Sequence, residues 1–316
     1  MGTTIGDQLD RKVQEIEEIL KEALPEESGY AKTILEAMNY SIMAGGKRLR
    51  PLLMREMFYL FSGGDETVLR HFMVAIEMIH TYSLVHDDLP ALDDDDMRRG
   101  RESTHKKFGE AMGILAGDAL LNAAYEQIST ALSAVAKREI VGAIKKNDQM
   151  WRAVMAFRKL ASCAGVSGMI GGQVVDVENT GKDIDAEMLL YIYRGKTSAL
   201  IAAAMMVGAI LGGADEYSLQ MIERIGCDIG MAFQIRDDIL DVTGDSEEMG
   251  KPVHSDEGQN KFTYAAIHGI EDSEKAVEEY TDQALKRLEA LPVATSRVET
   301  KEFLKGLFLM MAKRNQ

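Results

Sequence analysis

The stretch VLRHFMVAIEMIHTYSLVHDDLPALDDDDMRRG, residues 68–100, joins an apolar stripe to a dense run of charge. In its first half the apolar side chains recur at spacings of three and four residues, which is typical of one face of a helix. Those side chains are Val68, Phe72, Ala75, Ile76, Ile79 and Tyr82. Pro90 ends the pattern, because proline disfavours helix in the residue before it. The stretch therefore predicts an apolar helix whose carboxyl end carries two aspartates.

The same helical spacing dominates the rest of the chain. It recurs in residues 13–24, 189–193, 221–239 and 277–288, whereas period-two alternation bounded by turn residues is hard to find. No segment is long enough, or biased enough in composition, to be a domain linker. We therefore expect an all-α protein, a helical bundle of roughly ten helices that forms one domain over residues 1–316.

One apolar segment requires a choice between a membrane span and a core helix. Residues 197–214 carry no charged side chain, but they are rich in Ala and Gly rather than Leu and Phe. We expect a helix buried on all sides and no membrane span. The N-terminus has no apolar signal region, and Cys163 and Cys227 are too few for a disulfide framework. Both features favour a cytoplasmic protein with two reduced thiols.

Composition and charge exclude several classes of protein. Hydrophobic residues make up 46% of the 316 residues, which excludes a largely disordered chain. The formal net charge is -15, from 36 Lys+Arg against 51 Asp+Glu, and the sequence has no run of basic residues that would form a strongly positive patch. Nucleic acid is therefore not the expected partner, because its binding requires a basic surface.

Two clusters of aspartate suggest metal binding. Six acidic residues fall within residues 87–96, and a second group, Asp237, Asp238 and Asp241, ends another apolar stripe. Asp237 and Asp241 share one helix face, where like charges repel each other unless a cation binds them. Mg²⁺ prefers a few carboxylates together with the phosphates of a substrate. A solvated acidic loop would explain either cluster alone, but the two together favour a substrate that carries phosphates.

Cations that suit such phosphates are also present. Residues 45–51, GGKRLRP, place three cations after a glycine pair, and Arg98 and Arg99 follow the first acidic cluster. Because one arginine guanidinium can bind two phosphate oxygens at once, these residues predict a second phosphate site that needs no metal. Single further candidates for anion binding are His80, Lys196, Lys251 and Lys261.

These motifs occur together in one known family. The sequence resembles the trans-isoprenyl diphosphate synthases, in particular the bacterial short-chain type that makes farnesyl or geranylgeranyl diphosphate. The resemblance covers about residues 40–264. The matching motifs are GGKRLRP at 45–51, HDDLPALD at 86–93, RRG at 98–100, FGEA at 108–111, GDAL at 117–120, GGQ at 171–173, KT at 196–197 and FQIRDDILD at 233–241.

The resemblance implies a fold, a reaction and a role for each motif. It implies the all-α terpenoid-synthase fold around a central cavity, usually homodimeric, and head-to-tail condensation of isopentenyl diphosphate with an allylic diphosphate. Three Mg²⁺ ions, for which Mn²⁺ can substitute, are expected on Asp87, Asp88, Asp93, Asp237, Asp238 and Asp241. Arg98, Lys196 and Lys251 would contact the allylic diphosphate, with Lys261 as a further candidate. Lys47, Arg50, His80 and Arg99 would hold isopentenyl diphosphate, and Thr197 and Gln234 would line the reacting carbons.

Product length follows from the residues one turn before the first aspartate. Tyr82 and Ser83 would form the floor of the cavity in which the prenyl chain grows. In the resembling family, an aromatic residue at the position of Tyr82 goes with a C15 product, farnesyl diphosphate, and a small residue favours C20 or longer. Gly195 departs from the family, where a larger polar residue is common, and this suggests a looser helix around Lys196.

Other functions remain as alternatives. A geranylgeranyl diphosphate synthase would share every motif. A terpene cyclase would have a different second metal motif and no need of Lys47, Arg50 and His80. A non-catalytic partner subunit would have lost one aspartate motif, and a divalent-ion buffer would not require the cations.

Overall fold

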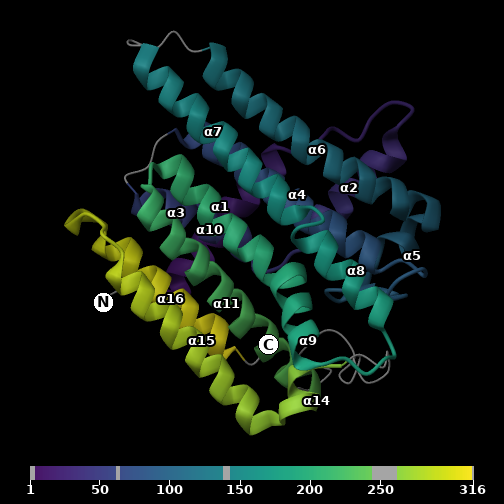
Figure 1. Ribbon diagram of the computed structural model, residues 1–316. Coiled ribbons are helices and arrows are strands. Elements are labelled where there is room, and N and C mark those ends of the chain that lie inside the picture. Colours follow the sequence, from purple (N-terminus) through teal and green to yellow (C-terminus); the bar gives the residue numbers. More distant parts are fainter. Residues whose placement is uncertain (1–3, 62–64, 138–142, 244–261, 315–316) are drawn as a thin grey trace. The chain divides into compact units, whose positions relative to one another are not determined.

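The computed structural model describes residues 4–61, 65–137, 143–243 and 262–314, and the side chains of 143–147 are outside this description. These residues form helices almost throughout, so the predicted all-α class is confirmed (Figure 1). They group into two compact units, the first from 1–52 and 65–153 and the second from 53–64 and 154–316. The prediction of one domain over the whole chain stays a prediction.

The first unit contains the helices on either side of the first acidic cluster. Its elements are α1 (Ile5–Glu22), α2 (Lys32–Ile42), α4 (Glu66–Asp87), β1 (Met97–Arg98), β2 (Arg101–Glu102), α5 (Thr104–Phe108) and α6 (Glu110–Lys137). The strands form a two-residue antiparallel ladder with Met97 opposite Glu102. Two further helices, α3 (Leu49–Leu60) and α7 (Ala143–Ala164), begin in the first unit and end in the second.

The second unit contains the remaining helices. They are α8 (Met169–Asn179), α9 (Ala186–Tyr193), a π-helical turn at Arg194–Ser198, α10 (Ala199–Gly212), α11 (Glu216–Thr243), α14 (Tyr264–His268), α15 (Ile270–Ala290), a 3₁₀ turn at Thr295–Arg297 and α16 (Val298–Lys313). The helix predicted to be buried on all sides is confirmed, since nearly every residue of α10 is buried.

Within the first unit, α4 is the central helix and packs against α6, α2 and α1. Its apolar residues are buried on several faces, so little of the helix other than its carboxyl end is left to carry polar groups. The carboxyl end lies close to α6 because Gly117 has no side chain. A Cβ atom there would overlap the imidazole of His86, whose Nε2 hydrogen-bonds to the carbonyl of Ile114 (3.0 Å).

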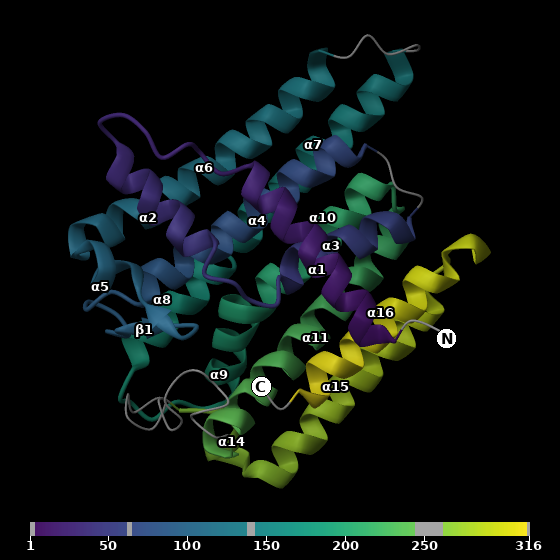
Figure 2. The ribbon, with the colours of Figure 1, turned by 180° about the vertical axis from the view of Figure 1, so that it is seen from behind.

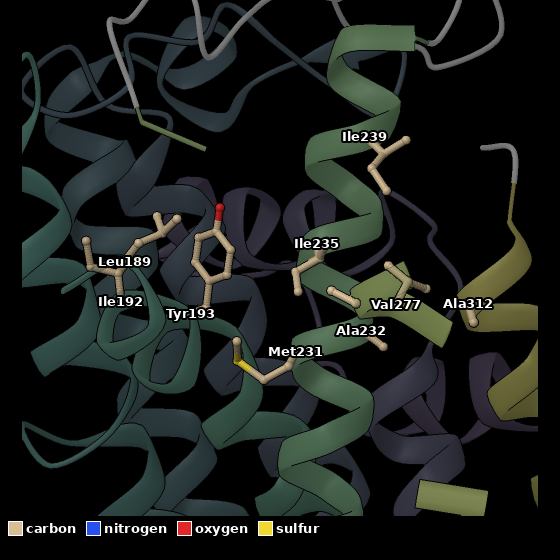
Figure 3. Close-up of a cluster of buried hydrophobic side chains, with 10 residues drawn as sticks. Leu189, Ile192, Tyr193, Met231, Ala232, Ile235, Ile239, Val277 and Ala312 are labelled. Atoms are coloured by element: carbon tan, nitrogen blue, oxygen red, sulfur yellow. The ribbon is translucent and has the colours of Figure 1, made fainter. Parts of the chain in front are cut away.

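Within the second unit, α11 lies between α10 on one side and α15 and α16 on another (Figure 2). Gly226 and Gly230 let α11 approach α10 closely, because a Cβ atom at Gly230 would lie 2.5 Å from the Cα of Ser198. Figure 3 shows the apolar cluster at this place, where Tyr193 of α9 stands opposite Met231 and Ile235 of α11. The cluster fixes α11 near the π-helical turn.

Two long apolar stretches lie among the described residues, Asp148–Asn179 and Ala186–Gly212. Either would be long enough to cross a membrane by length and composition, but core helices of soluble proteins pass the same test. The most apolar window of Ala186–Gly212 is 78% buried, which favours a core helix. Cys163 and Cys227 are free thiols, and burial raises the pKa of both.

One buried cation holds the first unit together. Arg48 has φ 46° and donates to Glu17 Oε1 of α1, Glu77 Oε1 of α4 and the carbonyl of Ile42, each at 2.6 Å. Burial alone would lower the pKa of Arg48, but the carboxylates of Glu77 and Glu17 raise it overall. The three cations of GGKRLRP therefore differ in role, because Arg48 faces inward.

Replacing Arg48 with Met should cost about 3 kcal/mol of unfolding free energy, because Glu77 would keep a buried and uncompensated charge. The matched control is Arg70→Met, since Arg70 also joins α4 to α1, through Glu22, but as an exposed pair at 3.5 Å. We expect the control to lose less than about 1 kcal/mol. Urea unfolding of both variants measures this difference, and equal losses would contradict the role given to Arg48.

Candidate active site

The chain folds back on itself directly after α4. The backbone N–H of Asp93 donates to the carbonyl of Asp87 (2.8 Å), and that of Asp95 donates to the carbonyl of Asp88 (3.1 Å). Asp94 has φ 52°, a left-handed conformation that this tight return requires. The fold thus brings the backbones of Asp87 and Asp93 together, although five residues separate them in sequence.

The second aspartate of this motif faces inward. Asp88 is 2% exposed and accepts hydrogen bonds from Nε (2.9 Å) and Nη2 of Arg98, which also pairs with Asp95. Burial raises the pKa of Asp88, although Arg98 opposes this effect. Asp88 is therefore bound through Oδ1 to a cation of its own chain.

The glycine pair before Lys47 makes room for Arg99. Gly45 and Gly46 have φ of 84° and 126°, and a Cβ atom on Gly46 would lie 2.6 Å from the Arg99 guanidinium. That guanidinium donates to the carbonyl of Gly45. Arg99 itself has φ 54°. The predicted link between GGKRLRP and Arg99 is thus a direct contact in the first unit, and Lys47 lies exposed beside it.

His80 lies within the positive field of these arginines. Burial lowers the pKa of His80 well below its usual value, and the charges of Arg50, Arg99, Arg48 and Arg98 lower it further. The imidazole is therefore neutral at physiological pH. A neutral ring can donate one hydrogen bond to an anion, while the surrounding arginines supply the charge.

In the second unit, the aspartates of the second motif lie in the last turns of α11. Asp238 is 2% exposed and accepts hydrogen bonds from the Tyr193 hydroxyl, the backbone N–H of Tyr264 (2.8 Å) and Gln234 Nε2 (3.2 Å). Its carboxylate thus ties α11 to α9 and α14.

Asp237 points toward the C-terminus of the described chain. It is 38% exposed on its side chain and pairs with Arg314, the residue after α16. Arg314 also stacks on Phe233, with its Cζ atom 3.9 Å from the ring centre. Arg236 Nε donates to the backbone carbonyl of Arg314 (3.0 Å), so two successive residues of α11 hold the end of α16.

The π-helical turn presents Lys196 and Thr197. Thr197 Oγ1 donates to Gln234 Oε1 (2.6 Å), and Lys196 Nζ pairs with Asp176 of α8 (2.6 Å). A Cβ atom at Gly195 would lie 2.8 Å from the Cα of Gly172, so this glycine lets α8 pack directly on the turn. The expectation that Gly195 loosens the helix around Lys196 stays a prediction. Single π-helical turns often mark functional sites.

Tyr82 is buried on α4 between polar neighbours. Its ring meets the His86 imidazole edge to face, with 5.9 Å between the centroids. Burial raises its pKa to about 12, with smaller effects from Tyr125 and Asp87. The neighbouring Ser83 donates its hydroxyl to the carbonyl of His80 (2.9 Å) on its own helix. Of the two predicted floor residues, Tyr82 thus has far more volume to contribute.

Sequence reasoning did not identify three of these residues. Asp176 lies three residues after Gln173 of the GGQ motif, about one helical turn further on. An acidic residue at that spacing was the signal that could have identified it. Tyr193 precedes Lys196 on an apolar stripe, and Arg314 stands in a segment without a motif. The predicted substrate ligands Lys251 and Lys261 lie outside the described residues.

The carboxylates fit Mg²⁺ in chemistry, but they form no complete cage. Among the described residues, no group of three or more His, Cys, Asp or Glu side chains could hold a metal ion by itself. Mg²⁺ commonly binds one or two carboxylates and takes its other ligands from water and substrate phosphates. The six predicted ligands, Asp87, Asp88, Asp93, Asp237, Asp238 and Asp241, stay a prediction.

Comparison with known proteins identifies the family. The model of the polyprenyl synthetase family matches residues 31–296. The chain belongs to the polyprenyl synthetase family. This family assignment confirms the resemblance seen in the motifs and the predicted enzyme class, a transferase of prenyl groups.

Individual members of the polyprenyl synthetase family are similar over most of the chain. Farnesyl diphosphate synthase of Geobacillus stearothermophilus is 40% identical over 280 residues, which cover 89% of this chain and 90% of that protein. A chloroplastic geranylgeranyl pyrophosphate synthase of Catharanthus roseus is 43% identical, over 81% and 68%. A Helicobacter pylori geranyltransferase structure, complexed with magnesium and isoprenyl diphosphate, superposes with a TM-score of 0.83 at 27% identity, over 99% of each chain.

Proposed function

We propose that this synthase makes farnesyl diphosphate by adding isopentenyl diphosphate, head to tail, first to dimethylallyl and then to geranyl diphosphate. The observation that carries the proposal is that α4 carries two charged regions of opposite sign. His80 lies in the positive field of Arg50 and Arg99, which suits direct binding of one diphosphate, and the Asp87–Asp93 return at the end of the helix brings together aspartates, which suit a second diphosphate through Mg²⁺. Asp87 follows His80 by seven positions on the helix, a rise of about 10 Å at 1.5 Å per residue. A cyclase, which takes one diphosphate, would not need the first site.

The aspartate motifs are proposed to receive the allylic diphosphate. Asp87, Asp88, Asp93, Asp237, Asp238 and Asp241 would hold Mg²⁺, or Mn²⁺ in its place, and Asp88 and Asp237 would do so beside the arginines that they contact, Arg98 and Arg314. When bound, Mg²⁺ neutralises the charge that develops on the departing diphosphate. Arg98 and Lys196 would contact that diphosphate directly, as would Lys251 and Lys261.

The cations around His80 are proposed to hold isopentenyl diphosphate. Arg50 and Arg99 would bind its oxygens, Lys47 would approach from the exposed side, and His80 would donate one hydrogen bond. Because burial and the neighbouring arginines hold the pKa of His80 well below its usual value, this donor is neutral. These contacts would position the double bond of isopentenyl diphosphate for reaction, with His80 acting as a neutral donor.

The carbons react near the hydrogen-bonded pair Thr197–Gln234. Because Thr197 Oγ1 donates to Gln234 Oε1, the lone pairs of Thr197 remain available to face an allylic carbocation. The isopentenyl double bond attacks this carbocation, and the released diphosphate then accepts the proton that the new chain loses. Water must be excluded, since it would capture the carbocation.

We also propose that the enzyme is a cytoplasmic homodimer. The outer face of α6 exposes Ile114 (48%) and Leu115 (49%), which is unusual for a helix whose other face is core. Beside them an apolar groove of about 700 Å³ runs between α6 and the segment before α2, lined by Ala31, Ile34, Met112, Leu115 and Ala119 among others. A second copy of the chain would cover this face.

The direct test is a primer series with the purified protein, isopentenyl diphosphate and Mg²⁺. We expect the C5 and C10 allylic diphosphates to give a C15 product, the C15 primer to be elongated poorly, and a chelator to abolish turnover. Chromatography of the dephosphorylated products measures chain length. A C20 product would keep the reaction and replace the product assignment, and undiminished turnover in chelator would contradict the metal role.

Product length tests the floor of the cavity. Tyr82→Ala should shift the main product from C15 to C20 or longer, because a buried aromatic ring is replaced by open volume. Tyr82→Phe is the matched control and should keep C15, since it preserves the ring. If Tyr82→Ala still stops at C15, another residue forms the floor.

A further inference from the structure

The end of α16 is bound to the second aspartate motif by several contacts. Arg314 Nη2 donates to Asp237 Oδ1 and to the carbonyl of Phe233 (3.4 Å), and its guanidinium stacks on the Phe233 ring. Arg236 holds the Arg314 backbone. The Arg314 side chain is only 13% exposed, so this is a docked residue and not a loose surface ion pair.

The partner of Arg314 is the exposed carboxylate of the motif. Asp238 is buried and accepts three hydrogen bonds, whereas Asp237 is 38% exposed and its charged neighbour on the same helix face is Asp241. These like charges repel each other, and the guanidinium relieves that repulsion. A divalent cation on Asp237 would relieve it as well, but its charge would repel the guanidinium a few ångströms away. Arginine and metal therefore compete for one carboxylate.

We propose that Arg314 is a built-in counterion of Asp237, which it occupies until metal and diphosphate bind and which it thereby makes harder for the metal to reach. The inference rests on the proposed function in one respect, the assignment of Asp237 as a metal ligand. The contacts with Phe233 and Arg236 keep the arginine docked, so the exchange moves only a side chain. By linkage, bound metal weakens the Arg314–Asp237 contact by the same factor.

Metal binding tests this without relying on turnover. Free Mn²⁺ is titrated by electron paramagnetic resonance in the presence of a non-reactive thiolodiphosphate analogue of the allylic substrate. Arg314→Ala should bind the Asp237-dependent ion about two- to fivefold more tightly than the wild type, the size expected for losing one competing ion pair. Arg314→Gln, which leaves a shorter, uncharged polar side chain, should show the same gain.

The matched control is Lys313→Ala. Lys313 is an exposed cation one residue earlier, so its loss changes the net charge equally without touching Asp237. We expect the Mn²⁺ affinity of the Lys313→Ala variant to stay within about twofold of the wild type, because exposed charges act weakly at a distance. In a D237N background the further change of Arg314 to Ala should have no effect.

Three results would overturn the proposal. Equal or weaker Mn²⁺ affinity in both Arg314 variants would show that the arginine does not compete. An equal gain in Lys313→Ala would assign the effect to net charge. Wild-type binding that D237N leaves unchanged would remove Asp237 from the metal site, and the primer series decides separately whether the enzyme still elongates prenyl chains.

Discussion

The repulsion between the closely spaced carboxylates of the two aspartate motifs is the constraint on which this structure depends. Aspartates close together repel each other, and burying them raises the cost further. The chain meets this cost with its own cations. Arg98 binds Asp88, Arg314 binds Asp237, and Lys196 binds Asp176. The protein can thus fold around its aspartate motifs before any metal or substrate is present, and binding then becomes an exchange of counterions.

Glycines also allow close packing around the candidate site. Gly46, Gly117 and Gly195 each lie where a Cβ atom would meet a side chain or backbone of the site. They allow Arg99, His86 and the π-helical turn to come close to neighbouring segments. Rigid helices with such close contacts fix the positions of polar groups well, which suits a reaction whose rate depends on holding two charged substrates in register.

Much of this could be predicted from the sequence, because helical spacing shows which residues share a face and motif order shows the family. The spacing predicted α4, its terminal aspartates and the buried α10. It could not show that Asp88 and Asp238 face inward while Asp237 does not, because adjacent residues near a helix end differ only in direction. Nor could it find Arg314, whose partner lies 77 residues earlier in the chain and whose segment has no motif. Such pairings are set by tertiary packing.

The central claim is that the carboxylates become a metal site only together with the diphosphate. Equilibrium dialysis with Mn²⁺, with and without the non-reactive allylic analogue, tests it most directly. The account expects weak binding by the protein alone and up to three tightly bound ions per chain once the analogue is present. Tight binding without the analogue would show a preformed metal cage, and no gain on adding it would show that the aspartate motifs do not share metal with a diphosphate. Either result would contradict the account.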